Sequence, residues 1–299
     1  PQAMVTAKIS TNLWAETMAT AFTKRKDPRP IPKYYRVNTI PGFVPNQETF
    51  DEIKFHIANG DPAIALIGPT GVGKSGLARY VGASFGDAGY AVFTVDCAAH
   101  VKSENLFDMV DITAQTGLVV RLGSLCTAAR ETAELKCKLL VIMDEWNALE
   151  DESRKLFYPL FGRHHRHHRV QHTKGGEYQD PIDFSHVTFL LTANPPDINY
   201  LTDDLKPMSN AEIRRLVILD MPYETNHDRL EAIFKGIVTR LPSYRRVVKK
   251  EPDLEKEIPW KLGVKSLYYV RSAAPIQATS IDMKVEKRDL ATEECAVCQ

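Results

Sequence analysis

The stretch GPTGVGKS, at residues 68–75, limits what this chain can fold into more than any other part of it. It follows the apolar run AIALIG (63–68) and opens KSGLARYVGASF (74–85), whose apolar spacing predicts a helix. The pattern G-x-x-x-x-G-K-[ST] between a buried strand and a helix is typical of a loop that wraps phosphate groups, and a chance glycine turn rarely meets both the pattern and its context. The stretch therefore predicts an α/β fold with an anion site at a helix N-terminus.

Each residue type in this loop has a chemical task. The glycines let the backbone curl so that successive N–H groups face phosphate oxygens. Lys74 is expected to reach the β- and γ-phosphates of a nucleotide, and the Ser75 hydroxyl to bind Mg²⁺. The predicted nucleotide-binding residues are Gly68, Pro69, Thr70, Gly71, Val72, Gly73, Lys74, Ser75 and Gly76.

Further apolar runs predict the rest of the sheet. Together with residues 63–68, strands are expected at 90–96, 139–144, 187–194 and 215–222, and helical stretches such as 152–161 separate them. Continuous apolar strands that alternate with helices indicate a parallel sheet covered on both faces. The predicted fold class is therefore α/β, with a doubly wound, five-stranded parallel sheet between helices.

Changes in composition along the chain mark three regions. Residues 1–45 hold a predicted short helix at 10–24, followed by a proline-rich stretch that is typical of an arm or linker. The predicted α/β core spans 46–222 and opens with a helix. Residues 223–299 form the third region, whose pattern turns helical, notably at 226–241.

The run LLVIMDEW, residues 139–146, places two acidic side chains at the end of a predicted strand. A site that hydrolyses a nucleotide needs a metal anchor and a base. Asp144 would hold Mg²⁺ through water, and Glu145 would polarise the attacking water. An acidic turn after a buried strand is common by itself, so this assignment depends on the phosphate loop upstream.

Two later segments carry further polar candidates. Asn194 ends a predicted strand and can present its amide beside the γ-phosphate, although an Asn-Pro pair is otherwise a turn starter. Arg214 and Arg215 lie immediately before the fifth strand, where an arginine can stabilise γ-phosphate charge in a neighbouring subunit. The alternative for this pair is a solvated basic helix end. The predicted catalytic residues are Glu145, Asn194, Arg214 and Arg215, and the predicted metal ligands are Ser75 and Asp144.

The composition narrows the classes of function. Lys and Arg together number 38, as do Asp and Glu, so no overall positive charge attracts nucleic acid. No apolar run approaches the ~18 residues of a membrane helix, and the N-terminus lacks a signal pattern. Five scattered cysteines fit reduced thiols. We expect a cytoplasmic protein without membrane contact, and a solvated tail rather than a zinc site at Cys295 and Cys298.

The phosphate loop, the Asp144–Glu145 pair, Asn194 and the paired arginines occur in an order and at separations that resemble those of the AAA+ ATPases. DEWNAL (144–149) is similar to the DEINRA of the MoxR-type group, and LTANPPD to its ATQNP. That group includes gas-vesicle, Rubisco-activating and McrB-like relatives, and the resemblance covers about residues 46–240. It implies a P-loop AAA+ core followed by a small α-helical lid, with ATP bound at the subunit interfaces of a ring that is usually a hexamer.

The resemblance also implies two hairpins. MoxR-type proteins carry an insert in the second helix, and residues 104–131 look like it, with TGLVV (116–120) and RLGSL (121–125) indicating a hairpin between helical halves. A second hairpin is expected over residues 167–184, turning at Gly175–Gly176. In such rings both hairpins point toward the central pore or the upper face.

The stretch RHHRHHRVQH, residues 163–172, is rich in histidine and arginine. A metal site, a solvated polar helix end and a pore-facing surface that touches an anionic or peptide client are the three hypotheses for it. The interleaved arginines oppose a bound cation, and the internal position excludes a tag. Among the functional hypotheses we favour the client-contacting surface.

The sequence thus predicts a Mg²⁺-dependent ATPase of the AAA+ class, which assembles into a homo-oligomeric ring and couples hydrolysis to the remodelling of a protein client. A second hypothesis is an ATP-gated module that binds DNA or RNA through basic clusters at 24–30, 163–169 and 245–250. A third, a P-loop small-molecule kinase, is disfavoured by the positions of Asn194 and the arginine pair.

Overall fold

The computed structural model describes residues 30–97, 101–113, 117–169, 181–195 and 208–239. The predicted helix at 10–24, the turn at Gly175–Gly176, His172, Cys295 and Cys298, and the basic cluster at 245–250 lie outside these ranges, as does nearly all of the cluster at 24–30. The described elements are η1 (Lys33–Tyr35), α2 (Gln47–Ala58), β1 (Ala63–Ile67), α3 (Lys74–Asp87), β2 (Ala91–Asp96), α4 (Ser103–Leu106), β3 (Asp108–Thr113), β4 (Gly117–Leu122), α5 (Ser124–Glu134), β5 (Leu139–Asp144), η2 (Trp146–Ala148), α6 (Asp151–Lys155), β6 (His167–His168), β7 (Ile182–Asp183), β8 (Val187–Ala193), α7 (Asn210–Ile213), β9 (Val217–Asp220) and α8 (His227–Val238).

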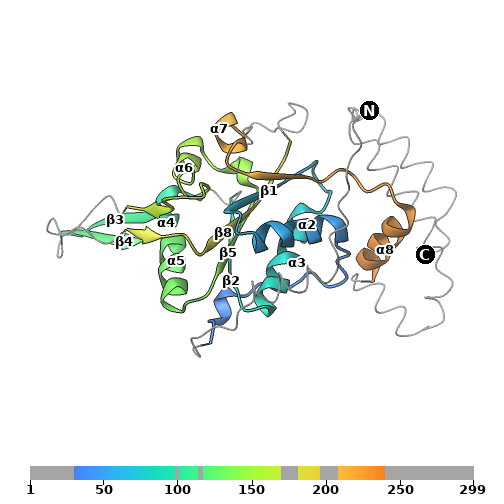
Figure 1. The fold of residues 1–299 in the computed structure, drawn as a ribbon, viewed down its shortest axis with the longest axis horizontal. Helices are drawn as coiled ribbons and strands as arrows, with labels where there is room; N and C mark the ends of the chain where they lie inside the picture. The colour runs from blue at the N-terminus through green and yellow to red at the C-terminus, as the bar shows by residue number, and fades with distance from the viewer. Residues whose placement is uncertain (1–29, 98–100, 114–116, 170–180, 196–207, 240–299) are drawn as a thin grey trace. The chain divides into compact units, whose positions relative to one another are not determined.

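A sheet of five parallel strands forms the centre of the core, in the order β2-β5-β8-β1-β9 (Figure 1). These are the five strands predicted from the apolar runs, at nearly the predicted bounds, so the α/β fold class is confirmed. In the register of the sheet, Ile64 on β1 pairs with Leu190 on β8 and with Val217 on β9. Because all five strands run the same way, their carboxyl ends meet at one edge of the sheet.

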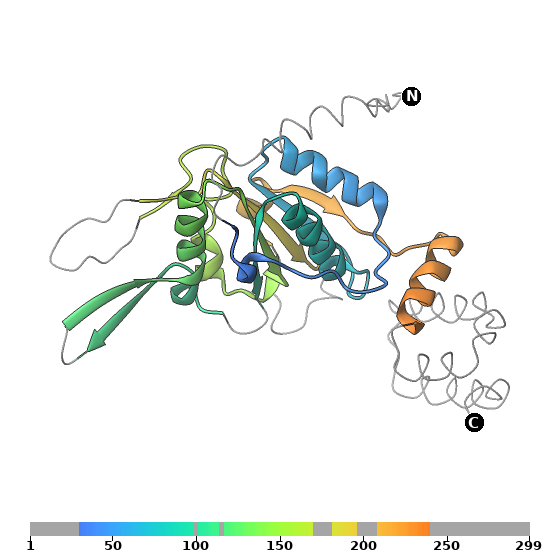
Figure 2. The ribbon, with the colours of Figure 1, turned by 90° about the horizontal axis from the view of Figure 1, so that it is seen from below.

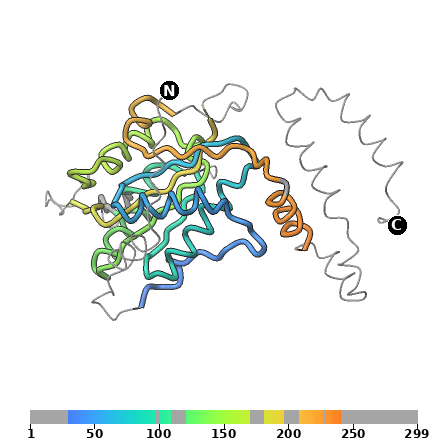
Figure 3. Tube along the Cα trace, turned by 45° about the vertical axis from the view of Figure 1, so that its right-hand side comes forward, coloured from blue at the N-terminus to red at the C-terminus, as the bar shows by residue number. Residues whose placement is uncertain are grey.

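Both faces of the sheet are covered, which explains why its strands read as continuous apolar runs. On β5, Leu140 and Ile142 belong to the face that α3 covers, and a Cβ added at Gly82 of α3 would lie only 2.7 Å from Ile142 Cδ1. Helix α2 lies beside α3 (Figure 3). Phe50 of α2 packs edge-on against Tyr80 of α3, with ring centroids 5.1 Å apart.

The opposite face of the sheet packs against α5 and a group of aromatic side chains. From β5, Leu139, Val141 and Met143 enter this core. Trp146 and Phe157 meet edge to face at a centroid distance of 5.2 Å. The fully buried aromatic residues of this cluster are Phe107, Trp146, Phe157, Phe161, Phe184 and Phe189. They fix the segment that directly follows β5.

The expected insert between β2 and β5 is present. An antiparallel hairpin, β3 with β4, lies between the short helix α4 and helix α5 and extends away from the sheet (Figure 2). The assignment of its strands from the sequence was wrong, because GLVV (117–120) and the start of RLGSL belong to one strand, β4, and the partner strand is β3. Gly123 follows β4 in extended conformation as the N-cap of α5, which begins at Ser124.

The helix predicted at 152–161 is shorter than expected. α6 ends at Lys155, and the chain continues in turns closed by bonds such as Tyr158 N–H to Lys155 O and Leu160 N–H to Phe157 O. Pro159 has no N–H to donate and disfavours helical conformation in the residue before it. The apolar spacing of residues 152–161 therefore predicted correctly that one side of this segment is buried, but it overestimated the length of the helix.

The described part of the proline-rich arm is packed rather than free. Tyr35 is buried, and the hydroxyls of Tyr34 and Tyr35 both donate to Glu131 Oε2 on α5, at 2.9 and 2.8 Å. The bond with Glu131 raises the pKa of the exposed Tyr34, whereas burial, together with this bond, raises the pKa of Tyr35. The segment is thereby held against the core.

Contacts within the chain divide it into two compact units, one of residues 1–40 and 45–222 and the other of 41–44 and 223–299. In the second unit α8 begins at the N-cap Asn226, whose Oδ1 accepts from Asp228 N and Arg229 N. Across the described residues no helix has the length and apolar character needed to cross a membrane.

The base of the hairpin provides a test of the packing. A Cβ at Gly123 would lie 2.4 Å from the backbone carbon of Leu106, whereas one at Gly86 in α3 would meet nothing closer than Val92 at 3.8 Å. We expect Gly123→Ala to lower the free energy of unfolding by about 1–3 kcal/mol, and Gly86→Ala to raise it by up to about 1 kcal/mol through helix propensity. Urea denaturation followed by circular dichroism measures both, and equal effects of the two changes would contradict the close approach.

Candidate functional site

The loop between β1 and α3 has the backbone that its glycines predict. Gly71 and Gly73 adopt left-handed conformations, with φ of 79° and 98°, which side chains rarely allow. Gly68 is required for another reason, because a Cβ there would lie 2.3 Å from the carbonyl oxygen of Met221, just after β9. The loop ends at Lys74, the first residue of α3, so free N–H groups of the helix face the space beside it.

Lys74 is buried at the centre of this loop. Its Nζ donates to the carbonyl oxygens of Gly68 and Pro69, at 2.6 and 3.0 Å, and to Asn194 Oδ1 at 3.0 Å. Burial lowers the pKa of Lys74 to about 8, and the nearby carboxylates of Asp144 and Glu145 oppose this shift. The ammonium group is thus held by neutral oxygens in a place that would favour an anion.

Asp144 ends β5 and is the acceptor at the centre of the site. Its Oδ1 accepts from Ser75 Oγ at 2.7 Å and from Thr192 Oγ1 at 2.6 Å. The contact with Ser75 joins two elements that are 69 residues apart. One carboxylate oxygen therefore ties the start of α3 to the ends of β5 and β8.

Glu145 is exposed and occupies an unusual backbone conformation for a residue other than glycine, with φ of 57° and ψ of 48°. Its N–H donates to Thr192 Oγ1 at 2.9 Å. The next residue, Trp146, is fully buried in the aromatic cluster. The turn between them keeps the Glu145 side chain at the surface of the site while its neighbour is anchored in the core.

Asn194 follows β8 and lies opposite Lys74. Its backbone N–H donates to Asn147 Oδ1 at 2.8 Å, and its side-chain oxygen accepts from Lys74. Asn147 is itself buried in η2. The residue predicted to present its amide beside the γ-phosphate is therefore held by its backbone on one side and by its side chain on the other.

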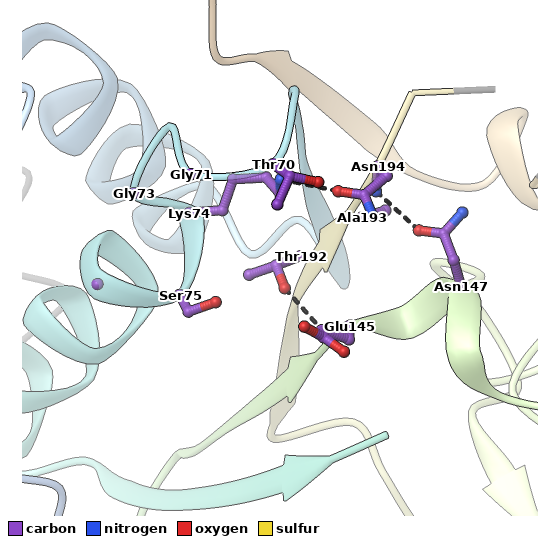
Figure 4. Close-up of a pocket in the computed structure, with 11 residues that line it drawn as sticks. Thr70, Gly71, Gly73, Lys74, Ser75, Glu145, Asn147, Thr192, Ala193 and Asn194 are labelled. Carbon is purple, nitrogen blue, oxygen red and sulfur yellow. Dashed lines mark hydrogen bonds between the residues drawn. The ribbon is translucent and has the colours of Figure 1, made fainter. Parts of the chain in front are cut away.

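These side chains surround one cavity, with the phosphate loop on one side and the ends of β5 and β8 on the other (Figure 4). Of the predicted residues, Gly68, Pro69, Val72, Asp144 and the arginine pair do not line it, although Asp144 contacts Ser75 directly. The lining residues are Thr70, Gly71, Gly73, Lys74, Ser75, Gly76, Glu145, Asn147, Thr192, Ala193 and Asn194.

Sequence reasoning missed two polar residues of this cavity. Thr192 is one of two threonines in the otherwise apolar run of β8 and lies two positions before Asn194, so strand alternation places both on the same face. Asn147 lies within the DEWNAL stretch that suggested the family, but only Asp144 and Glu145 were assigned a task there. Both residues could have been found from these signals.

Arg214 and Arg215 are not brought to the cavity of their own chain. They follow α7 directly and precede β9, as predicted, and both are exposed. Arg215 Nη1 donates to Ala211 O at 2.5 Å, and its guanidinium lies 5.3 Å from the ring centroid of Tyr158. For Arg214, the described part of the chain offers no hydrogen-bond acceptor to the side chain. Both arginines thus lie at the surface, and Arg215 has contacts within its own chain.

The histidine-rich stretch is divided between interior and surface. Arg166 is buried and donates to the carbonyl oxygens of Leu160 and Val187, and burial lowers its pKa to about 10. His168 is also buried, where its Nε2 lies 2.9 Å from Asp108 Oδ1. β6, which contains His168, pairs with β7 as the second expected hairpin requires.

The hypotheses for this stretch can now be compared. The helix-end interpretation is wrong, because α6 ends at Lys155 and turns follow. Among the described residues, no group of three or more His, Cys, Asp or Glu side chains is arranged to hold a metal. The basic cluster at 163–169 was one of those proposed to bind nucleic acid. Within it, Arg163 donates to Asp61 Oδ1 at 2.8 Å, so part of the positive charge of the cluster is already paired with a carboxylate.

One family model matches this chain, that of the AAA domain of the dynein-related subfamily, over residues 63–216. The matched span begins at β1, includes the phosphate loop, Asp144, Glu145 and Asn194, and ends just after the arginine pair. A comparison with curated proteins gave no significant match. A match over more than half of the chain, together with the complete sheet and loop, shows that this protein belongs to the AAA family as a nucleotide-hydrolysing ATPase with a dynein-related AAA domain.

Proposed function

We propose that this chain is a Mg²⁺-dependent ATPase of the MoxR-type group that works as a homo-oligomeric ring and remodels a protein client. The observation that carries the proposal is that the segments after β1, β5 and β8 meet at one cavity, which Lys74, Glu145 and Asn194 line, while Asp144 is bonded to the lining residue Ser75. MoxR-type membership is supported by the DEWNAL and LTANPPD stretches and by the two hairpins. The hairpins are the surfaces we propose for the client.

Lys74 and the loop bind the triphosphate in this proposal. Phosphate oxygens replace the three neutral oxygens that now hold the Lys74 ammonium, and the left-handed loop directs its N–H groups at them. Asn194, released from Lys74, presents its amide to the γ-phosphate. The cavity thus contains both a cation and an amide for the terminal phosphate.

Ser75 and Asp144 would hold Mg²⁺. Their oxygens already lie 2.7 Å apart, and a hydroxyl with a carboxylate is the kind of hard oxygen donor set that this ion prefers beside phosphates. When bound, the ion neutralises charge on the β- and γ-phosphates. Thr192, which donates to the same Asp144 oxygen, keeps the carboxylate oriented.

Glu145 is the general base of the proposed reaction. Its carboxylate lines the cavity, and its backbone is fixed by Thr192 on one side and by buried Trp146 on the other. The carboxylate accepts a proton from water as that water attacks the γ-phosphorus. Arg214 and Arg215 stabilise the developing charge from a neighbouring subunit, since their own cavity does not contain them.

The roles of Lys74 and Glu145 predict different kinetic losses. We expect Lys74→Ala to weaken ATP binding by about 100-fold or more, because a charge-assisted contact in the bound state is lost. We expect Glu145→Gln to leave the Kd within about 3-fold and to lower kcat by about 10²- to 10⁴-fold. Titration with a fluorescent ATP analogue and a phosphate-release assay measure the two quantities. Lys138→Ala, at an exposed lysine, is the control, and equal loss of affinity in the two site variants would contradict the roles.

The lowered pKa of Lys74 predicts a pH dependence of nucleotide affinity. Bound phosphate favours the protonated lysine, so the pKa of Lys74 rises when the nucleotide binds. The Kd should therefore be constant below pH 8 and should increase as the pH rises through the free-state pKa of about 8. The slope should approach a tenfold change per pH unit. We expect this in titrations of Glu145→Gln, which does not hydrolyse, from pH ~7 to ~9.5. A constant Kd over that interval would show that Lys74 stays fully protonated.

Mixed rings test whether the site is shared. The double variant Arg214→Ala, Arg215→Ala should lose about 10³-fold or more in kcat, and the variant Lys74→Ala should show little activity because it binds ATP weakly. A mixture under conditions of subunit exchange contains interfaces with an intact loop on one side and intact arginines on the other. We expect partial activity to return, and specific activity of the unmodified protein to rise with concentration. Failure of both would favour a monomeric ATPase.

A further inference from the structure

Glu212 is a fully buried carboxylate on α7, two residues before the arginine pair. Its Oε1 accepts from Trp146 Nε1 at 3.0 Å, and Arg154 Nη1 lies 3.4 Å from the same oxygen. Its Oε2 accepts from the backbone N–H of Ser209, whose hydroxyl accepts in return from Glu212 N–H. Donors from three separate elements therefore converge on one side chain.

Helix capping explains only part of this arrangement. Ser209 and Glu212 form a capping box at the start of α7, a device that works at the surface and needs no buried charge. A carboxylate with no exposed surface is costly unless its partners are placed to compensate. The contacts with Trp146 and Arg154 are thus additional to capping, and they connect α7 to the rest of the core.

Each partner of Glu212 is itself fixed. The Trp146 ring packs against Phe157 and Phe161, at centroid distances of 5.2 and 5.5 Å, and Trp146 directly follows Glu145. Arg154 is buried in α6 and also pairs with Asp151. The short turn that carries the arginines is thereby held by the same segment that holds the Glu145 backbone.

We propose that Glu212 is a positioning residue that orients Arg214 and Arg215 toward the neighbouring subunit. α7 has four residues, too few to keep a fixed direction without tertiary contacts. The buried carboxylate supplies those contacts, and its bond to Trp146 ties the arginine turn to the strand end of the subunit's own site. The inference rests on the shared site proposed above, but it concerns a residue that contacts neither nucleotide nor metal.

The first test separates positioning from binding. We expect Glu212→Gln, which keeps the shape of the side chain, to lower kcat by about 10-fold or more while the Kd for a fluorescent ATP analogue stays within about 2-fold. The loop that binds the nucleotide does not contact Glu212, so a general loss of folding would change both quantities. Asp151→Asn is the matched control, because it makes the same carboxylate-to-amide change at another partner of Arg154 without touching Trp146 or α7.

The second test determines whether the defect of Glu212→Gln lies in the arginines or in the subunit's own nucleotide site. Glu212→Gln subunits have an intact loop and misplaced arginines, so mixing them with Lys74→Ala subunits should restore activity. Mixing them with the double arginine variant should restore none, because no interface then has well-placed arginines. The reverse pattern would overturn the proposal and place the defect in the subunit's own site.

Two further arms keep the outcome decisive. The mixture of Lys74→Ala with the double arginine variant is the reference. If this mixture regains no activity, the shared site itself is wrong. If it regains activity but the mixture of Glu212→Gln with Lys74→Ala does not, only the role of Glu212 is wrong. Trp146→Phe removes the indole N–H but keeps an aromatic ring, and it should show the same pattern with a loss of about 5-fold. Should Glu212→Gln not fold, this variant decides, and wild-type activity in it would refute the proposal.

Discussion

The parallel pairing of β1, β5 and β8 is the constraint on which the rest of the structure depends. Because the three strands run side by side in one direction, the residues that follow them meet at one edge of the sheet. The phosphate loop follows β1, Asp144 ends β5 and Asn194 follows β8. A change of strand order would separate these groups even if every side chain were kept, so the chemistry of the site is set first by sheet topology.

Hydrogen bonds between these elements then hold the side chains of the site in fixed positions. Asp144 accepts from Ser75 and Thr192, and Lys74 donates to Asn194, so the loop, β5 and β8 are linked by side chains that have chemical tasks of their own. Burial strengthens these bonds, and it also lowers the pKa of Lys74, whose ammonium is held by neutral oxygens. The groups that hold the loop in shape are thus those that we propose for nucleotide binding.

Trp146 connects the apolar core with the site, because it is buried in the core and directly follows Glu145. Its ring is anchored among aromatic residues, its neighbour Glu145 is exposed in the cavity, and its indole N–H holds Glu212 below the arginine pair. The arginines do not line the cavity of their own chain, and the proposed shared site assigns them to a neighbouring subunit. One buried side chain therefore connects the turn that carries Glu145 with the turn that carries the arginines.

The sequence by itself determined the five strands, the phosphate loop and the strand-end residues Asp144, Glu145 and Asn194, because periodicity and glycine conformation are local properties. Tertiary structure decided the rest. The extent of α6 depended on Pro159 and on packing. The strands of the first hairpin depended on the pairing of residues across it. Strand alternation could have placed Thr192 on the face of Asn194, but its bond to Asp144 could not be predicted, nor could the bond of Glu212 to Trp146, because these partners lie tens of residues away and only the fold brings them within hydrogen-bonding distance.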